Sequence, residues 1–275
     1  MELIHFYIII TVLVICIILV YAYFYKSKNI PKVETLFTDA LNAMVSGNNA
    51  KATNLLRNVV KQDSSHVRAY LQLGNILRKD NPNQALKIHQ SLTVRPNLNL
   101  ELQSDIHRAL AKDYMEIGDI LKSQLEAKKV LKIEKRNLWA IRFLIQSAEK
   151  NQSWDEAASW TKQLTKVTGR KNEVDEAKFD VYRGLDCLNN GNVNMAESLF
   201  KKAINMSPEY NLSYKYLGDL YDKTRDLVKA LEYWEIFAKK DIVNGKKVYA
   251  KIESALFDLG RYSEVEKFYR NLLEL

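Results

Sequence analysis

The sequence is poor in residues that interrupt helices and in residues that cross-link a fold. Its 275 residues include only nine glycines, four prolines and two cysteines. Because alternating runs rich in valine and isoleucine are also missing outside the N-terminus, this composition predicts an all-α protein. Two cysteines, Cys16 and Cys187, cannot build a disulfide scaffold or a zinc ribbon.

The short motifs of common catalytic sites are missing as well. HExxH, GxSxG, GxxxxGK[ST] and GxGxxG do not occur, so the sequence offers no direct sign of metal, acyl-transfer or nucleotide chemistry. We expect His66, His89 and His107 to fill core or helix-capping positions, because no cysteine or carboxylate recurs near them at metal-ligand spacing. We therefore predict no catalytic residue, no metal, no cofactor and no small-molecule substrate, and we expect that the protein is not an enzyme.

Positive charge is present in excess but is not concentrated. The formal charge is +8 at pH 7, and the lysines and arginines are spread along the chain without a basic block or an interleaved aromatic platform. Nucleic-acid binding usually shows one of these features. We expect no nucleic-acid partner.

Residues 3–25 lack charged side chains, and 15 of these 23 residues are Leu, Ile, Val or Phe. A helix of this length spans about 35 Å, which exceeds the roughly 30 Å hydrocarbon core of a bilayer. We predict an N-terminal transmembrane anchor at 1–25 and a juxtamembrane linker at 26–32. A cleaved signal peptide is the alternative, but the basic start and the small-x-small cleavage site are missing.

The charges that flank this segment predict its orientation. Glu2 is the only charged side chain before it, whereas Lys26, Lys28 and Lys32 follow. Positive charges stay on the cytoplasmic side of a membrane. The sequence therefore predicts a single-pass protein of the bacterial inner membrane with its C-terminal part in the cytoplasm.

The rest of the chain repeats a helical hairpin, most clearly between residues 211 and 240. Tyr214, Leu217, Gly218 and Tyr221 form one apolar stripe, and a second stripe follows a short turn, at Ala230, Trp234 and Phe237. Small residues recur at the Ala230 position of the second helix, at Ala196, Ala157, Ser123, Ala85 and Ala52. Two helices cannot bury both stripes alone, so such hairpins stack on one another.

A two-helix unit near 34 residues with these small and aromatic positions resembles the tetratricopeptide repeat. We predict a superhelical solenoid of about seven repeats, at 33–66, 67–96, 104–137, 138–167, 177–210, 211–244 and 246–275. Small residues are expected to let the two helices of each repeat approach closely. These packing residues are Gly74, Ala85, Ala111, Ala157, Gly184, Ala196, Gly218 and Ala230.

The first helices of the repeats are expected to line a concave groove that binds proteins. The predicted exposed line passes through Leu71, Asn75, Arg78, Arg108, Lys112, Arg142 and Gln146. Its arginines could bind partner carboxylates bidentately, while Asn75 and Gln146 satisfy the partner backbone. Further along, Lys215 is followed by Asp219 and Asp222, so the sign of the groove is expected to change. The alternative is that these residues only keep the surface hydrated.

The segments AYLQLGNILR, ALKIHQSL and LAKDYMEIGD, at residues 69–78, 85–92 and 110–119, resemble repeats of the lipopolysaccharide assembly protein B family of Gram-negative bacteria. That family also begins with one membrane span followed by cytoplasmic tetratricopeptide repeats. The resemblance implies a non-catalytic inner-membrane adaptor that regulates lipopolysaccharide biosynthesis by linking the lipid A deacetylase to a membrane AAA protease.

This chain departs from that family at its C-terminus, where the family continues to a rubredoxin-like metal domain with two CxxC pairs. No CxxC pair occurs here, so the sequence is either a fragment or a protein without that module, and the family's metal is not carried over. Two other functions stay open. The chain could be a membrane-tethered scaffold for another envelope or secretion process, or the non-catalytic part of an enzyme.

Overall fold

The computed structural model describes residues 12–21 and 32–273, in which all regular secondary structure is α-helical. After residues 12–21, which are helical, the helices are α2 (Val33–Val45), α3 (Asn49–Gln62), α4 (Val67–Leu77), α5 (Pro82–Leu92), α6 (Leu100–Glu116), α7 (Ile120–Ile133), α8 (Leu138–Lys150), α9 (Trp154–Thr168), α10 (Glu173–Asn189), α11 (Val193–Met206), α12 (Leu212–Lys223), α13 (Leu227–Lys240), α14 (Ile242–Asp258) and α15 (Ser263–Leu273). The prediction of an all-α protein is confirmed.

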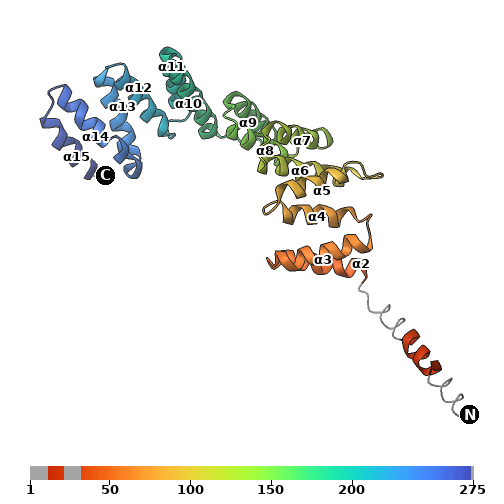
Figure 1. The fold of residues 1–275 in the computed structure, drawn as a ribbon. Coiled ribbons are helices and arrows are strands. Elements are labelled where there is room, and N and C mark those ends of the chain that lie inside the picture. Colours follow the sequence, from red (N-terminus) through yellow and green to blue (C-terminus); the bar gives the residue numbers. More distant parts are fainter. Residues whose placement is uncertain (1–11, 22–31, 274–275) are drawn as a thin grey trace, which may run out of the picture. The chain divides into compact units, whose positions relative to one another are not determined.

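The chain divides into two compact units, Met1–Gly118 and Asp119–Leu275. Within each unit every helix from α2 onward packs against the next helix in the chain, and α4 also contacts α6, as α10 contacts α12 (Figure 1). This is the nearest-neighbour packing of a repeat solenoid. The boundary falls inside the predicted repeat 104–137, so its helices α6 and α7 belong to different units.

Short polar turns start the second helix of most repeats. Asn48, Asp119 and Asp226 each accept a hydrogen bond from the backbone N–H three residues later, which caps α3, α7 and α13. In six repeats one residue of the turn between the two helices has a positive φ. It lies five positions before the position that Ala230 occupies in the second helix. The residues at this position are Gly47, Gly118, Gln152, Gly191, Arg225 and Gly260.

The eight predicted packing residues are all buried, and the glycines among them have a more specific role than the sequence suggested. A Cβ on Gly218 would lie 2.5 Å from Trp234 Cδ1, and one on Gly184 would lie 2.5 Å from Phe200 Cε1. A Cβ on Gly74 would overlap the His89 ring. The glycines therefore make room for a ring on the second helix, and not for the backbone of that helix.

In these three repeats the ring lies four residues after the small residue of the second helix, which is Ala85, Ala196 or Ala230. Other repeats fill the same pair of positions differently. At these positions the first repeat has Ala40 and Leu56, both fully buried. The last repeat has Glu253 and Tyr269, and the Tyr269 hydroxyl donates to Glu253 Oε1 at 2.7 Å. In these five hairpins, one pair of positions thus packs by complementary volume or by a hydrogen bond.

Most of the predicted membrane span lies outside the described residues. Its described part, residues 12–21, is helical, and its side chains are exposed. Within residues 12–21 and 32–273, the structure contains no helix with the length and apolar character needed to cross a bilayer. The predicted linker at 26–32 is described only at Lys32.

Candidate functional site

The seven predicted groove residues lie on or directly after the first helices of three repeats. In the first unit, Leu71 and Asn75 belong to α4, Arg78 directly follows α4, and Arg108 and Lys112 belong to α6; Arg142 and Gln146 belong to α8 in the second unit. Leu71 does not lie on an exposed line, because it is 5% exposed and packs with Leu92, Ile106 and Leu110. The helical period of α4 turns it toward the core of the first unit.

Arg78 is engaged inside the protein. Its Nε donates to Asp113 Oδ1 at 2.5 Å, and one Nη donates to Asn75 Oδ1 at 2.7 Å. The Asp113 carboxylate is fully buried, and only 16% of the Arg78 side chain is exposed. The sequence analysis did not predict this ion pair. The Arg78 guanidinium and the Asn75 amide oxygen were expected to bind a partner, but Arg78 is bonded to both Asp113 and Asn75.

His89 completes this buried network. Its Nε2 lies 3.1 Å from the Leu71 carbonyl oxygen, and its Nδ1 lies 2.5 Å from Asp113 Oδ2. The carbonyl can only accept, so Nε2 carries a proton. His89 and Asp113 are fully buried, so a substrate cannot reach them, and the network joins α4, α5 and α6 structurally.

A sequence signal for Asp113 was available. It follows Ile106, Ala109 and Leu110 at helical spacing, so it falls on the core-facing stripe of α6. A carboxylate on such a stripe requires a cationic partner, because burial of an unpaired charge is costly.

Three cations converge beside this network. Burial lowers the pKa of the Lys112 ammonium, and the positive charges of Arg78 and Arg108 lower that pKa further. Arg108 lies 3.6 Å from Asp105, so part of this charge is compensated locally. The first unit therefore carries a basic cluster at the end of α4 and on α6, with Lys112 its most exposed member.

In the second unit, the negative charge that was predicted to follow Lys215 is largely neutralised by lysines. Asp219 accepts hydrogen bonds from Lys215 and Lys251, each at 2.7 Å, and from Trp234 Nε1 at 3.0 Å. Burial alone would raise the pKa of Asp219, but the two lysines outweigh burial and hold that pKa below its usual value. The carboxylate therefore serves the packing of α12, α13 and α14.

Arg142 and Gln146 are exposed on α8, as predicted. Arg142 lines a cavity of about 450 Å³ together with Leu138, Thr165 and Arg170. Neither guanidinium forms an ion pair with another described residue. The cavity thus holds two guanidinium groups, the leucines Leu138 and Leu164 and one carboxylate, Asp175, so its net charge is positive.

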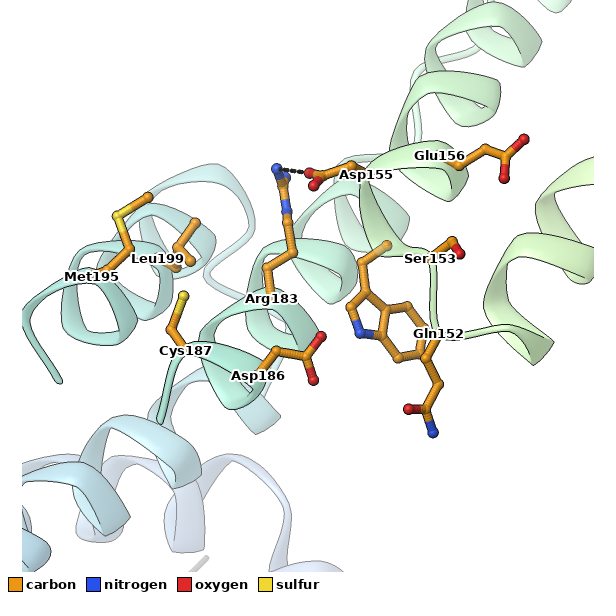
Figure 2. A pocket seen from close by; sticks show the side chains of 10 residues that line it. Gln152, Ser153, Asp155, Glu156, Arg183, Asp186, Cys187, Met195 and Leu199 are labelled. Atoms are coloured by element: carbon orange, nitrogen blue, oxygen red, sulfur yellow. Dashed lines mark hydrogen bonds and ion pairs between the residues drawn. The ribbon is translucent and has the colours of Figure 1, made fainter. Parts of the chain in front are cut away.

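A larger cavity of about 620 Å³ lies where the start of α9 meets α10 and α11. Figure 2 shows Cys187, Met195 and Leu199 on one side of Arg183, with Ser153 and Gln152 on the other. Arg183 crosses the cavity to Asp155, with 2.8 Å between Nη1 and Oδ1. None of the residues predicted as partner-binding lies in it.

Two N–H donors of this cavity are buried and have no acceptor among the described residues, namely Trp154 Nε1 and Arg183 Nε. The Trp154 ring is held in place by stacking on Tyr182, with ring centroids 4.5 Å apart. The Arg183 guanidinium is fixed at its other atoms by Asp155 and Asp180. These donors have fixed directions and can receive an acceptor from a bound molecule.

Solved structures show the same kind of fold. A tetratricopeptide repeat protein from Parabacteroides merdae aligns with a TM-score of 0.51 at 17% identity, over 88% of this chain and 97% of that structure. The C-terminal part of a repeat protein from Cytophaga hutchinsonii aligns with a TM-score of 0.56 at 14% identity, over 87% and 95%. The predicted tetratricopeptide-type solenoid is confirmed.

Sequence relatives agree with the resemblance found in the repeats, although no protein-family model matches the chain. Lipopolysaccharide assembly protein B of Escherichia coli K12 is 22% identical over 239 residues, which cover 86% of this chain and 61% of that protein. The Haemophilus influenzae protein of the same name is 24% identical over 216 residues, or 73% and 54%. The chain thus spans about three fifths of the length of the Escherichia coli relative. The predicted resemblance is confirmed: the chain has a tetratricopeptide-type solenoid fold and is similar in sequence to lipopolysaccharide assembly protein B.

Proposed function

We propose that this chain is a non-catalytic adaptor that binds other proteins and acts in lipopolysaccharide assembly. The similarity to lipopolysaccharide assembly protein B along 86% of the chain carries the proposal. The packing supports it, because stacked hairpins leave one side of each helix without a neighbour and form long surfaces suited to protein partners.

The proposed site of action is the cytoplasmic face of the inner membrane. The uncharged segment 3–25 and the lysines that follow it support this location. An anchor confines the repeats near other membrane proteins, so that modest affinities suffice for capture. Removing residues 1–25 should move the protein from the membrane fraction to the soluble fraction. Retention of the shortened chain on salt-washed membranes would contradict the anchor.

The proposed partners are the lipid A deacetylase and a membrane AAA protease. If the chain presents the deacetylase to the protease, its depletion must change the deacetylase level, which quantitative immunoblotting measures. An unchanged level under depletion would overturn this role and would favour a scaffold in another envelope process.

For partner contact we propose Arg142 and Arg170, whose guanidinium groups line one cavity and form no ion pair with the described residues. Arginine binds carboxylates bidentately, so an acidic partner segment fits this surface. Reversing both to glutamate should reduce co-purification of the deacetylase by about tenfold, as for a lost central charge pair. The double change Lys51→Glu/Arg57→Glu at exposed positions of α3 alters the net charge by the same amount. It is the control and should leave co-purification unchanged.

A further inference from the structure

We propose that the 620 Å³ cavity between α9, α10 and α11 receives a lysine or arginine side chain from an extended segment of a partner protein. This inference deepens the proposed adaptor function and rests on it, since it assigns a binding surface and the chemistry of what binds there. The volume lies within the range of about 300 to 1,000 Å³ that is common for ligand pockets.

The first argument is the charge of the cavity wall. Asp155, Glu156, Asp186 and Arg183 line it, which leaves an excess of negative charge in a chain whose formal charge is +8. Arg183 is compensated by Asp155 and Asp180, and Glu156 accepts from Lys128 and Trp160. The Asp186 carboxylate is exposed and forms no ion pair or hydrogen bond with another described residue. The Asp186 carboxylate is therefore available to pair with a cation.

The second argument is the apolar surface beside that carboxylate. Cys187 lies one residue from Asp186 on α10, and Met195 and Leu199 face the same cavity from α11 (Figure 2). Half of the Met195 surface is exposed. Lysine and arginine have long aliphatic stems that cover apolar surface while their charged ends reach a polar group. Methionine is well suited to this contact, because its flexible side chain adapts to the shape of the stem.

The third argument is the pair of buried donors. Trp154 Nε1 and Arg183 Nε have no acceptor among the described residues, and the carbonyl oxygens of an extended backbone are acceptors. A segment that lays its basic side chain toward Asp186 would bring its own carbonyl groups to the same cavity. An acidic side chain would meet three carboxylates there, and is therefore disfavoured.

The indole N–H signal of Trp154 reports directly on this binding. The full chain, labelled with ¹⁵N at its four tryptophans, would be titrated with short peptides of alternating alanine and serine whose central residue is lysine, norleucine or glutamate. Trp154→Phe identifies the signal. We expect the lysine peptide to shift this signal and to bind about tenfold more tightly than the norleucine peptide, as for one gained charge pair.

Asp186→Asn should abolish the preference for lysine over norleucine, whereas Asp258→Asn, which removes an exposed carboxylate at the end of α14, should preserve it. No shift with the lysine peptide at about 1 mM, the range of the weakest specific complexes, would overturn the inference. Equal binding of lysine and norleucine, or tighter binding of glutamate, would overturn it too. Peptide binding without any effect of depletion on the deacetylase level would instead refute the proposed role and leave the cavity assignment standing.

Discussion

The Nδ1 atom of His89 lies 2.5 Å from Asp113 Oδ2, and both side chains are completely inaccessible to solvent. His89 thereby fills the position that Phe200 and Trp234 fill in other repeats, beside a glycine of the first helix. It adds a polar link to the next helix pair that a phenyl ring cannot make.

We expect His89→Phe to destabilise the protein although a phenyl ring fits this position in another repeat. The substitution removes the imidazole donor from the Leu71 carbonyl and leaves Asp113 with Arg78 alone, which should lower the free energy of unfolding by about 1 to 3 kcal/mol. Urea unfolding monitored by circular dichroism measures the loss. The double variant His89→Phe/Asp113→Leu should recover part of it, and equal stability of His89→Phe and the parent would show that the network contributes nothing.

Gly218→Ala should disturb the ring packed against it. The new methyl group would overlap Trp234, and overpacking of this kind costs about 1 to 3 kcal/mol. Combining it with Trp234→Leu recreates the alanine and leucine pair of the first repeat, Ala40 and Leu56. The double variant should therefore lose less than the sum of the two single losses in a double-mutant cycle. Strict additivity would contradict the proposed complementarity of volume.

Arg225 has positive φ at a turn where glycine stands in four other repeats. A left-handed conformation is strained for residues with a Cβ, so Arg225→Gly should stabilise the protein by as much as about 1 kcal/mol. The midpoint of thermal unfolding measures this gain. The reverse change at the equivalent turn, Gly191→Arg, should lower the midpoint, and a fall with Arg225→Gly would show that the arginine contributes an interaction worth more than the strain.

Asp219 should make stability depend on pH in the acidic range. Its folded-state pKa is lowered by Lys215 and Lys251, so its contribution is fully present above the ordinary aspartate pKa of about 4 and is lost as pH falls further. Asp219→Asn should be less stable than the parent at pH 7, and the difference should shrink as the pH is lowered below 4. Urea midpoints across this range test the sign. A difference that stays constant with pH would show that the carboxylate does not titrate with folding.

Most of the fold could be predicted from the spacing of small and aromatic residues. Each hairpin is local, so the positions of Gly184, Ala196, Gly218 and Ala230 already indicate two helices and a turn. What such local reasoning could not predict was the division of the chain after Gly118, because that depends on packing between neighbouring hairpins.

The candidate sites were less predictable than the fold. Helical periodicity placed Arg142 and Gln146 on a surface, as observed, and it also placed Leu71 there, which is buried. A helix between two neighbours buries more than one stripe, so spacing alone cannot separate an exposed position from the second buried one. The cavity at Trp154, Arg183 and Met195 joins three helices, and no pattern within a single helix indicates it.

The sequence alone determined the helical character, the repeat length and the positions of the small residues, because these follow from contacts between residues close together in the chain. Only the tertiary structure decided which polar side chains remain available. Arg78 is taken up by Asp113, and Asp219 by Lys215 and Lys251, whereas Arg142 and Asp186 keep their charges free of ion pairs with the described residues. Ion pairs such as Arg78 with Asp113 and Asp219 with Lys251 join residues more than thirty positions apart, and that distance closes only when one hairpin packs on the next.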